Sequence, residues 1–184
     1  MNKIFFLILT LCGLFSCDKN DERNLKMLEL QSVNKAFNRV ELIYNQKNPL
    51  LRKFLNSAKK DKSNLYTSDM DEILNLTNNL NDSIEKGIDE LDKLREKIPN
   101  SYLIKTTTEY FRTVNDLESD MTEFLKLVTD SIENNHLEIT EKIGEGINKV
   151  LRKRSDYQNE LNRFYSENKF TRHEIDSLIG RPNR

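Results

Sequence analysis

Few side chains in this 184-residue sequence have types and spacing suited to metal or acid–base chemistry. There are two histidines, His136 and His173, and Glu133 precedes His136 at the spacing of a helical carboxylate–histidine metal pair. A di-iron bundle needs two such pairs and two further inward carboxylates. Here the pair occurs once, on an expected turn, and no glutamate stands three residues before His173. We therefore expect neither a metal nor a cofactor.

The sequence also has no arrangement typical of a nucleophilic or phosphate-cradling enzyme site. It contains no Gly-x-Ser-x-Gly string and no glycine-rich loop between a strand and a helix. Gly144 and Gly146 lie inside a helical pattern. There they predict a bend or the close approach of another helix, with Gly87 as a candidate neighbour. We expect that the protein is not an enzyme.

The N-terminus has the three parts of a secretory signal. Lys3 supplies the positive charge, an apolar run extends from Ile4 to Leu14, and Ser16 is the small residue at the expected cleavage point. The run of about eleven apolar residues is short of the roughly 20 that a membrane-spanning helix needs. The pattern therefore favours an exported chain over one anchored by this segment.

The signal ends in the string Leu14-Phe15-Ser16-Cys17. This string resembles the lipobox of bacterial lipoproteins, in which a small residue precedes the cysteine that is acylated. Cys12 does not fit, since a bulky residue precedes it. The resemblance implies cleavage before Cys17, lipid on Cys17 and attachment of the mature chain to a membrane outside the cytoplasm. The alternative is an ordinary secretory signal that leaves a free thiol at the new terminus.

Charge and length suggest one anchored domain. The whole chain has 29 basic and 30 acidic residues, so it has no charge excess that would favour nucleic acid as a partner. We predict a signal peptide at 1–16, a lipidated tether at 17–23 and one domain at 24–184. The acidic residues behind Cys17 resemble sorting signals of two opposite kinds. We expect a location in the bacterial cell envelope, with the periplasm and the outer surface both open.

Apolar residues recur at three- and four-residue steps, which is the period of an amphipathic helix. The first helix is expected to end near Asn45. Asn48 and Pro49 then form an expected N-cap and first position of a short second helix. Residues 59–64 are the clearest expected loop.

A heptad seam follows from Met70 to Ile98, and Pro99 ends it. Two further helices are expected at about 103–128 and 139–165, with a turn at 134–135. A short helix is expected from about Arg172 to Ile179, preceded by a capping box. We predict an all-α fold, an elongated antiparallel bundle of about four helices with a short C-terminal helix.

Two kinds of surface could bind a partner. In the adjacent pairs Tyr110–Phe111 and Phe164–Tyr165, either one ring is left exposed as a partner surface or both rings pack into the core. The basic residues gather in two clusters that are either solvated faces or contacts for a polyanion: Arg52, Lys53, Lys59, Lys60 and Lys62, and Lys149, Arg152, Lys153 and Arg154.

From these features we predict a lipid-anchored envelope protein with a non-catalytic binding or scaffolding role towards another macromolecule. Its expected partners are the membrane, through Cys17, and a protein or other envelope component, with no nucleic acid. Self-association through Met70 to Ile98 is a further possibility. The alternative is a small-ligand- or metal-binding envelope protein that uses the bundle core.

Overall fold

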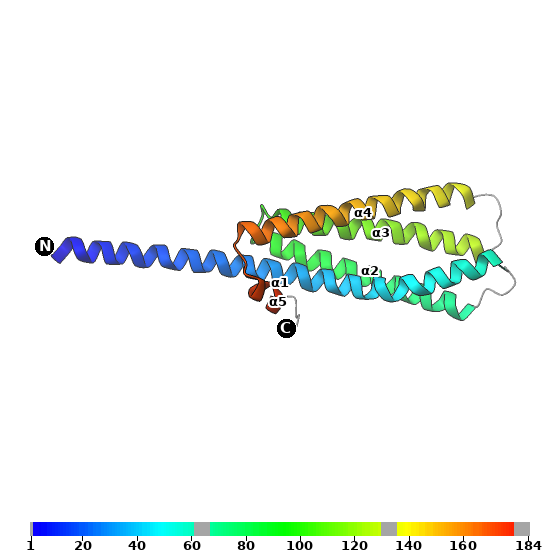
Figure 1. Cartoon of the computed structure of the whole chain (residues 1–184), viewed down its shortest axis with the longest axis horizontal. Helices are drawn as coiled ribbons and strands as arrows, with labels where there is room; N and C mark the ends of the chain where they lie inside the picture. Colours follow the sequence, from blue (N-terminus) through cyan, green and yellow to red (C-terminus); the bar gives the residue numbers. More distant parts are fainter. Residues whose placement is uncertain (1, 61–66, 130–135, 179–184) are drawn as a thin grey trace.

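The computed structural model describes the backbone of residues 2–60, 67–129 and 136–178, and the side chains of 21–54, 56, 69–127 and 139–178. Within these residues the chain is helical and contains no strand, as predicted. The elements are α1 (Asn2–Lys60), α2 (Thr67–Arg95), α3 (Tyr102–Thr129), α4 (His136–Glu167) and α5 (Arg172–Leu178). The first four form an elongated antiparallel bundle, and α5 lies against α1 (Figure 1).

α1 is one continuous helix, so the predicted break near Asn45 is wrong. Pro49 lies inside it. Proline removes one backbone hydrogen bond and crowds the carbonyl four residues earlier, which costs about 3 kcal/mol in a helix interior. Lys47 and Phe54 are buried on the two sides of Pro49. Packing on both sides therefore holds the segments in one helix, which bends in its last part (Figure 1).

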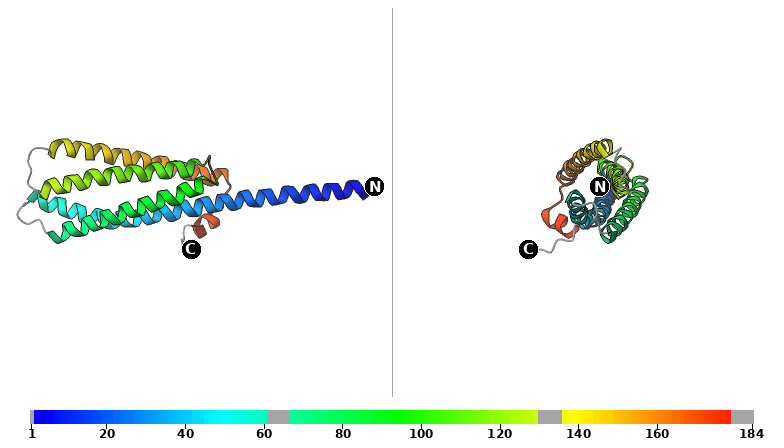
Figure 2. Two further views of the ribbon diagram at one scale, coloured as in Figure 1. Left: turned by 180° about the vertical axis from the view of Figure 1, so that it is seen from behind. Right: turned by 90° about the vertical axis from the view of Figure 1, so that its right-hand side faces the viewer.

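The N-terminal part of α1 extends beyond the other helices (Figures 1 and 2). Residues 17–23, predicted as an unpatterned tether, have helical backbone. Core packing begins at Glu29 and Leu30, which are both buried. We call the end of the bundle from which α1 projects the base; the turn at 96–101 and the junction between α4 and α5 also lie there (Figure 2). No helix among the described residues is long and apolar enough to cross a membrane.

The heptad seam of α2 faces the bundle core, as its spacing predicts. α2 packs on α1 and on α3. The buried seam residues are Met70, Ile73, Thr77, Leu80, Ile84, Gly87, Leu91 and Leu94. Because these side chains are covered within one chain, self-association through them would require helices to separate or exchange.

Two glycines permit close helix approach. A Cβ atom on Gly87 would lie 2.9 Å from the Phe111 ring of α3, and one on Gly146 would lie 2.9 Å from Leu117 Cδ1. Gly144 faces open space. The expected close approach therefore occurs at Gly146, but its neighbour is α3 rather than Gly87.

The C-terminal end folds back onto α1. Lys169 has a φ of 52°, and this left-handed residue turns the chain after α4. The predicted capping box is present: Glu174 Oε2 accepts a bond from the Thr171 amide at 2.8 Å, and the Glu174 amide donates to Thr171 Oγ1 at 3.3 Å. Leu178 packs against the core. Ile179 lies outside the described residues.

Candidate functional site

Of the two alternatives for the aromatic pairs, the structure shows the rings packed against the core and not an exposed surface. Tyr110, Phe111 and Phe164 are 2, 0 and 5% exposed, and Tyr165 is half-buried and packs against the core. Adjacent rings on a helix point about 100° apart, so both can be buried only if the helix has neighbours on several sides. α3 contacts α1, α2 and α4. Because α3 has neighbours on several sides, both Tyr110 and Phe111 are covered.

Tyr110 belongs to a cluster that joins three helices. Phe37 of α1 stacks on Tyr157 of α4 with 4.5 Å between ring centroids, and lies 5.7 Å from the Tyr110 ring. The Tyr110 hydroxyl donates a 2.9 Å bond to Glu41, which also pairs with Arg154 at 2.9 Å. Burial, together with the Glu41 charge, raises the pKa of the Tyr110 phenol. Ring packing, one hydrogen bond and one ion pair thus join the three helices, which gives the cluster a packing role.

A buried ion pair lies between α1 and α3. The side chains of Lys47 and Glu118 are 1% and 3% exposed, and they contact each other. Burial lowers the pKa of the Lys47 ammonium from 10.5 to about 8. A buried pair of this kind contributes little net stability, but the loss of one partner leaves an uncompensated charge.

The sequence does contain a signal for this pair, which the expected break in α1 concealed. Both charges occupy core positions of seven-residue series. One series on α1 is Val33, Val40, Lys47 and Phe54, and the matching series on α3 is Ile104, Phe111, Glu118 and Leu125. A cation and an anion in two otherwise apolar series could have predicted the contact.

The cations of the two basic clusters have different partners among the described residues. In the second, Lys153 pairs with Glu109 at 2.6 Å and Arg154 with Glu41, so these cations hold α4 against its neighbours. In the first, Lys53 pairs with Asp69 at 3.1 Å and Arg52 is exposed. The side chains of its other three lysines lie outside the described residues.

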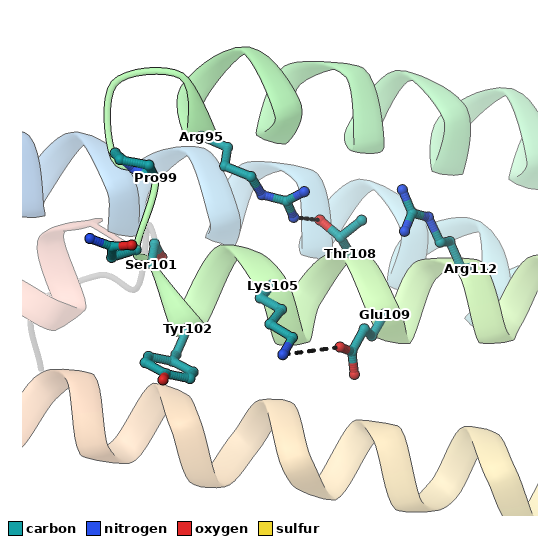
Figure 3. Close-up of a pocket in the computed structure, with 9 residues that line it drawn as sticks. Arg95, Pro99, Ser101, Tyr102, Lys105, Thr108, Glu109 and Arg112 are labelled. Atoms are coloured by element: carbon teal, nitrogen blue, oxygen red, sulfur yellow. Dashed lines mark hydrogen bonds and ion pairs between the residues drawn. The ribbon is translucent and has the colours of Figure 1, made fainter.

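A pocket of about 540 Å³ opens beside the turn at 96–101, at the base of the bundle (Figure 3). α2 ends there, and the amides of Lys97 and Ile98 donate to the Leu94 carbonyl. Ser101 starts α3 by accepting the Ile104 amide at 3.0 Å on its side chain, and its hydroxyl donates to the buried carboxylate of Glu29. This capped turn fixes the directions in which α2 and α3 present their side chains.

Three of the four charged residues around the pocket are positive. It is lined by Arg95, Pro99, Asn100, Ser101, Tyr102, Lys105, Thr108, Glu109 and Arg112. Arg95 reaches from α2 to within 3.5 Å of Thr108 Oγ1 on α3, and Arg112 extends from α3 (Figure 3). Arg95 also pairs with Asp92 at 3.1 Å. A concave surface with this composition can hold an anion.

The single acidic residue of the lining is already occupied. Glu109 Oε2 lies 2.6 Å from Lys153 Nζ, while Lys105 lies 4.0 Å from the other oxygen. The hydrogen bond from Lys153, with the charges of Lys153, Lys105 and Arg112, lowers the pKa of the Glu109 carboxyl. Glu109 is therefore ionised near neutral pH, and its shorter ion pair is with Lys153 of α4.

The remaining expectations concern metal and lipid. No group of three or more His, Cys, Asp or Glu side chains that could hold a metal ion occurs within the described part of the chain. His173 is exposed in the first turn of α5. Glu133 and the side chains of His136 and Cys17 lie outside the described residues, although the backbone at 17 belongs to α1.

No protein family, curated protein or solved structure matches the chain.

Proposed function

We propose that this is a lipid-anchored protein of a bacterial cell envelope with a non-catalytic binding or scaffolding role towards another macromolecule. The observation that carries the proposal is the continuity of α1. The lipobox-like string ends at Cys17, and the same helix passes from this position into the core. Thirteen helical steps separate Cys17 from the buried Leu30, which corresponds to roughly 20 Å.

This connection gives the proposed anchor a mechanical consequence. A flexible tether would let the bundle move freely around its lipid, whereas a helix transmits the orientation of its first turns to the core. Acyl chains on Cys17 would then hold the base near the bilayer and direct the far end of the bundle away from it. A rod held in this way suits the display of a surface to a partner.

The distribution of polar contacts also supports a scaffold. The cations of α4 form ion pairs with neighbouring helices: Lys142 with Asp120, Lys153 with Glu109, and Arg154 with Glu41. Ile147 and Leu151 on the same helix are 45% and 57% exposed. Ile147 is therefore outside the core, although it stands at the three- and four-residue spacing of the apolar positions of α4. No observation favours the alternative of a ligand in the core, whose described interior positions are filled by packed side chains.

The proposal is tested by comparing the two cysteines in a bacterial host. Cys17→Ala should release the protein from the membrane fraction or leave it as unprocessed precursor, and it should abolish incorporation of an alkyne-labelled fatty acid. Cys12→Ala is the matched control and should retain processing and label. Equal labelling of both variants, or membrane association without any lipid on Cys17, would contradict the anchor.

The binding role needs a separate experiment. Cross-linking in intact cells should join the wild-type protein to a discrete heavier species, and light scattering of the purified chain then tells whether that species is a second copy. A monomer that forms no cross-link in cells would contradict a binding role, even with the anchor confirmed.

A further inference from the structure

We infer that the pocket at the turn between α2 and α3 binds a phosphate group, carried either by a lipid headgroup or by a soluble phosphorylated molecule. The pocket itself does not depend on the proposed anchor. Only the assignment of its ligand to a lipid headgroup rests on the proposed function.

The first reason is uncompensated charge. Arg95, Lys105 and Arg112 line the pocket with Glu109 as the only acid, so the lining has an excess of two positive charges. The excess remains two when the neighbours Asp92 and Lys153 are included. Arg112 is exposed and forms no ion pair with any described residue. A cluster of this kind favours an anionic ligand.

The second reason is geometry. Two guanidinium groups approach the same space from different helices (Figure 3). Arg112 can donate two parallel hydrogen bonds to an oxyanion, whereas Arg95 already contacts Asp92 and Thr108 and adds its charge and remaining donors. Tyr102 adds a hydroxyl group and Asn100 adds an amide, whereas the Thr108 hydroxyl already donates to the Ile104 carbonyl at 2.9 Å. A phosphate has several oxygens with which to engage these donors, whereas a carboxylate has two. The volume of about 540 Å³ lies in the usual range for small-molecule sites.

The third reason is position. The pocket lies at the base, from which α1 projects towards Cys17 (Figures 1 and 2). Tyr102 on the pocket rim is 61% exposed, and Leu25 and Leu28 on the projecting side of α1 are each 40% exposed. Tyrosine is enriched where protein meets the headgroup layer, because its ring is amphipathic. With the base held near a bilayer, lipid phosphates are the most concentrated phosphate groups within reach.

The test uses the full chain with pyrophosphate as the soluble probe, in phosphatidylcholine nanodiscs if the chain is purified from membranes and in buffer if it is not. Calorimetric titration should detect binding that weakens as salt is raised. Arg95→Gln and Arg112→Gln should each weaken it by roughly tenfold or more, the effect of losing one charged hydrogen-bonding partner. Arg52→Gln, an exposed arginine on α1 away from the base, is the control and should bind like wild type.

The source of the phosphate is then identified by adding phosphatidic acid to the nanodiscs. If phosphatidic acid competes with pyrophosphate in the wild type but not in Arg112→Gln, the pocket binds a lipid headgroup. Pyrophosphate binding without competition would assign it to a soluble ligand. Absence of pyrophosphate binding, or equal weakening by Arg52→Gln, would overturn the site. Because the fatty-acid label on Cys17 is measured separately, failure of the pocket and failure of the anchor are distinguishable.

Discussion

α2 and α4 have similar lengths and similar spacing of apolar residues, but they are held in the bundle differently. α2 lies against α1 and α3, and its seam is buried from Met70 to Leu94. α4 packs mainly on α3, exposes Ile147 and Leu151, and is held along its edges by ion pairs. A heptad pattern thus specifies which face of a helix turns inward, while the number of neighbouring helices decides how much of that face is covered.

The largest effect on stability is expected from breaking the buried ion pair between Lys47 of α1 and Glu118 of α3. Glu118→Gln should destabilise the protein by about 3–5 kcal/mol, since it leaves the Lys47 ammonium buried without its partner. Chemical denaturation followed by circular dichroism measures the change. The double variant Lys47→Met with Glu118→Leu should recover most of the loss, because apolar side chains suit these positions. A double variant no more stable than Glu118→Gln would contradict this account of the pair.

The comparison between α2 and α4 is tested directly by a matched pair of truncations. Leu80→Ala removes a side chain with no exposed surface and should cost about 2–5 kcal/mol. Leu151→Ala removes a side chain that is 57% exposed and should change stability by less than about 0.5 kcal/mol. Equal losses in a denaturant titration would mean that α4 is covered in solution by something other than this chain.

Alanine substitutions at Gly87 of α2 and Gly144 of α4 should change stability by smaller amounts and in opposite directions. Gly87→Ala forces a Cβ atom to within 2.9 Å of the Phe111 ring and should destabilise the protein by about 1–3 kcal/mol. Gly144→Ala meets open space and should stabilise α4 by up to about 1 kcal/mol through helix propensity. The two melting temperatures should therefore move in opposite directions. A shift of the same sign in both would contradict the assigned close approach.

The smallest effect concerns the helix that follows α4. Hydrogen bonds from the Thr171 amide, the Arg23 guanidinium and the Thr171 hydroxyl lower the pKa of Glu174 from 4.5 to about 2. A carboxyl with a lowered folded-state pKa stabilises its fold fully above pH 4.5 and loses that contribution as pH falls through about 2. Amide hydrogen exchange in α5 should accelerate over this range before exchange in α2 does.

Glu174→Gln is the control for this titration. In this variant the α5 amides should exchange rapidly at every pH, and the acceleration of their exchange at low pH should be absent. An acid step that persists in the variant would mean that another group controls the docking of α5.

Prediction from sequence succeeded where the determining interactions are local or periodic. The seam of α2 repeats every seven residues, and the capping box of Thr171 and Glu174 spans a single turn. The fold class and the C-terminal helix followed from these patterns. At Pro49 the local rule failed, because burial of the residues on both sides outweighs the lost hydrogen bond.

The candidate site was much harder to predict. The two alternatives for the aromatic pairs stayed open because the number of neighbours around a helix cannot be deduced from the spacing on that helix itself. The basic pocket combines Arg95 from α2 with Lys105 and Arg112 from α3, and no local cluster in the sequence marks it. It forms only because the capped turn at Ser101 returns α3 alongside α2.

The central claim is that the helix leaving the base carries lipid at Cys17, and mass spectrometry of the mature N-terminus tests it most directly. The account predicts that the N-terminal peptide of protein from the bacterial membrane fraction starts at Cys17 and carries acyl groups. A peptide that continues unbroken from Ser16 to Cys17, or that starts at Cys17 with an unmodified thiol, would contradict it.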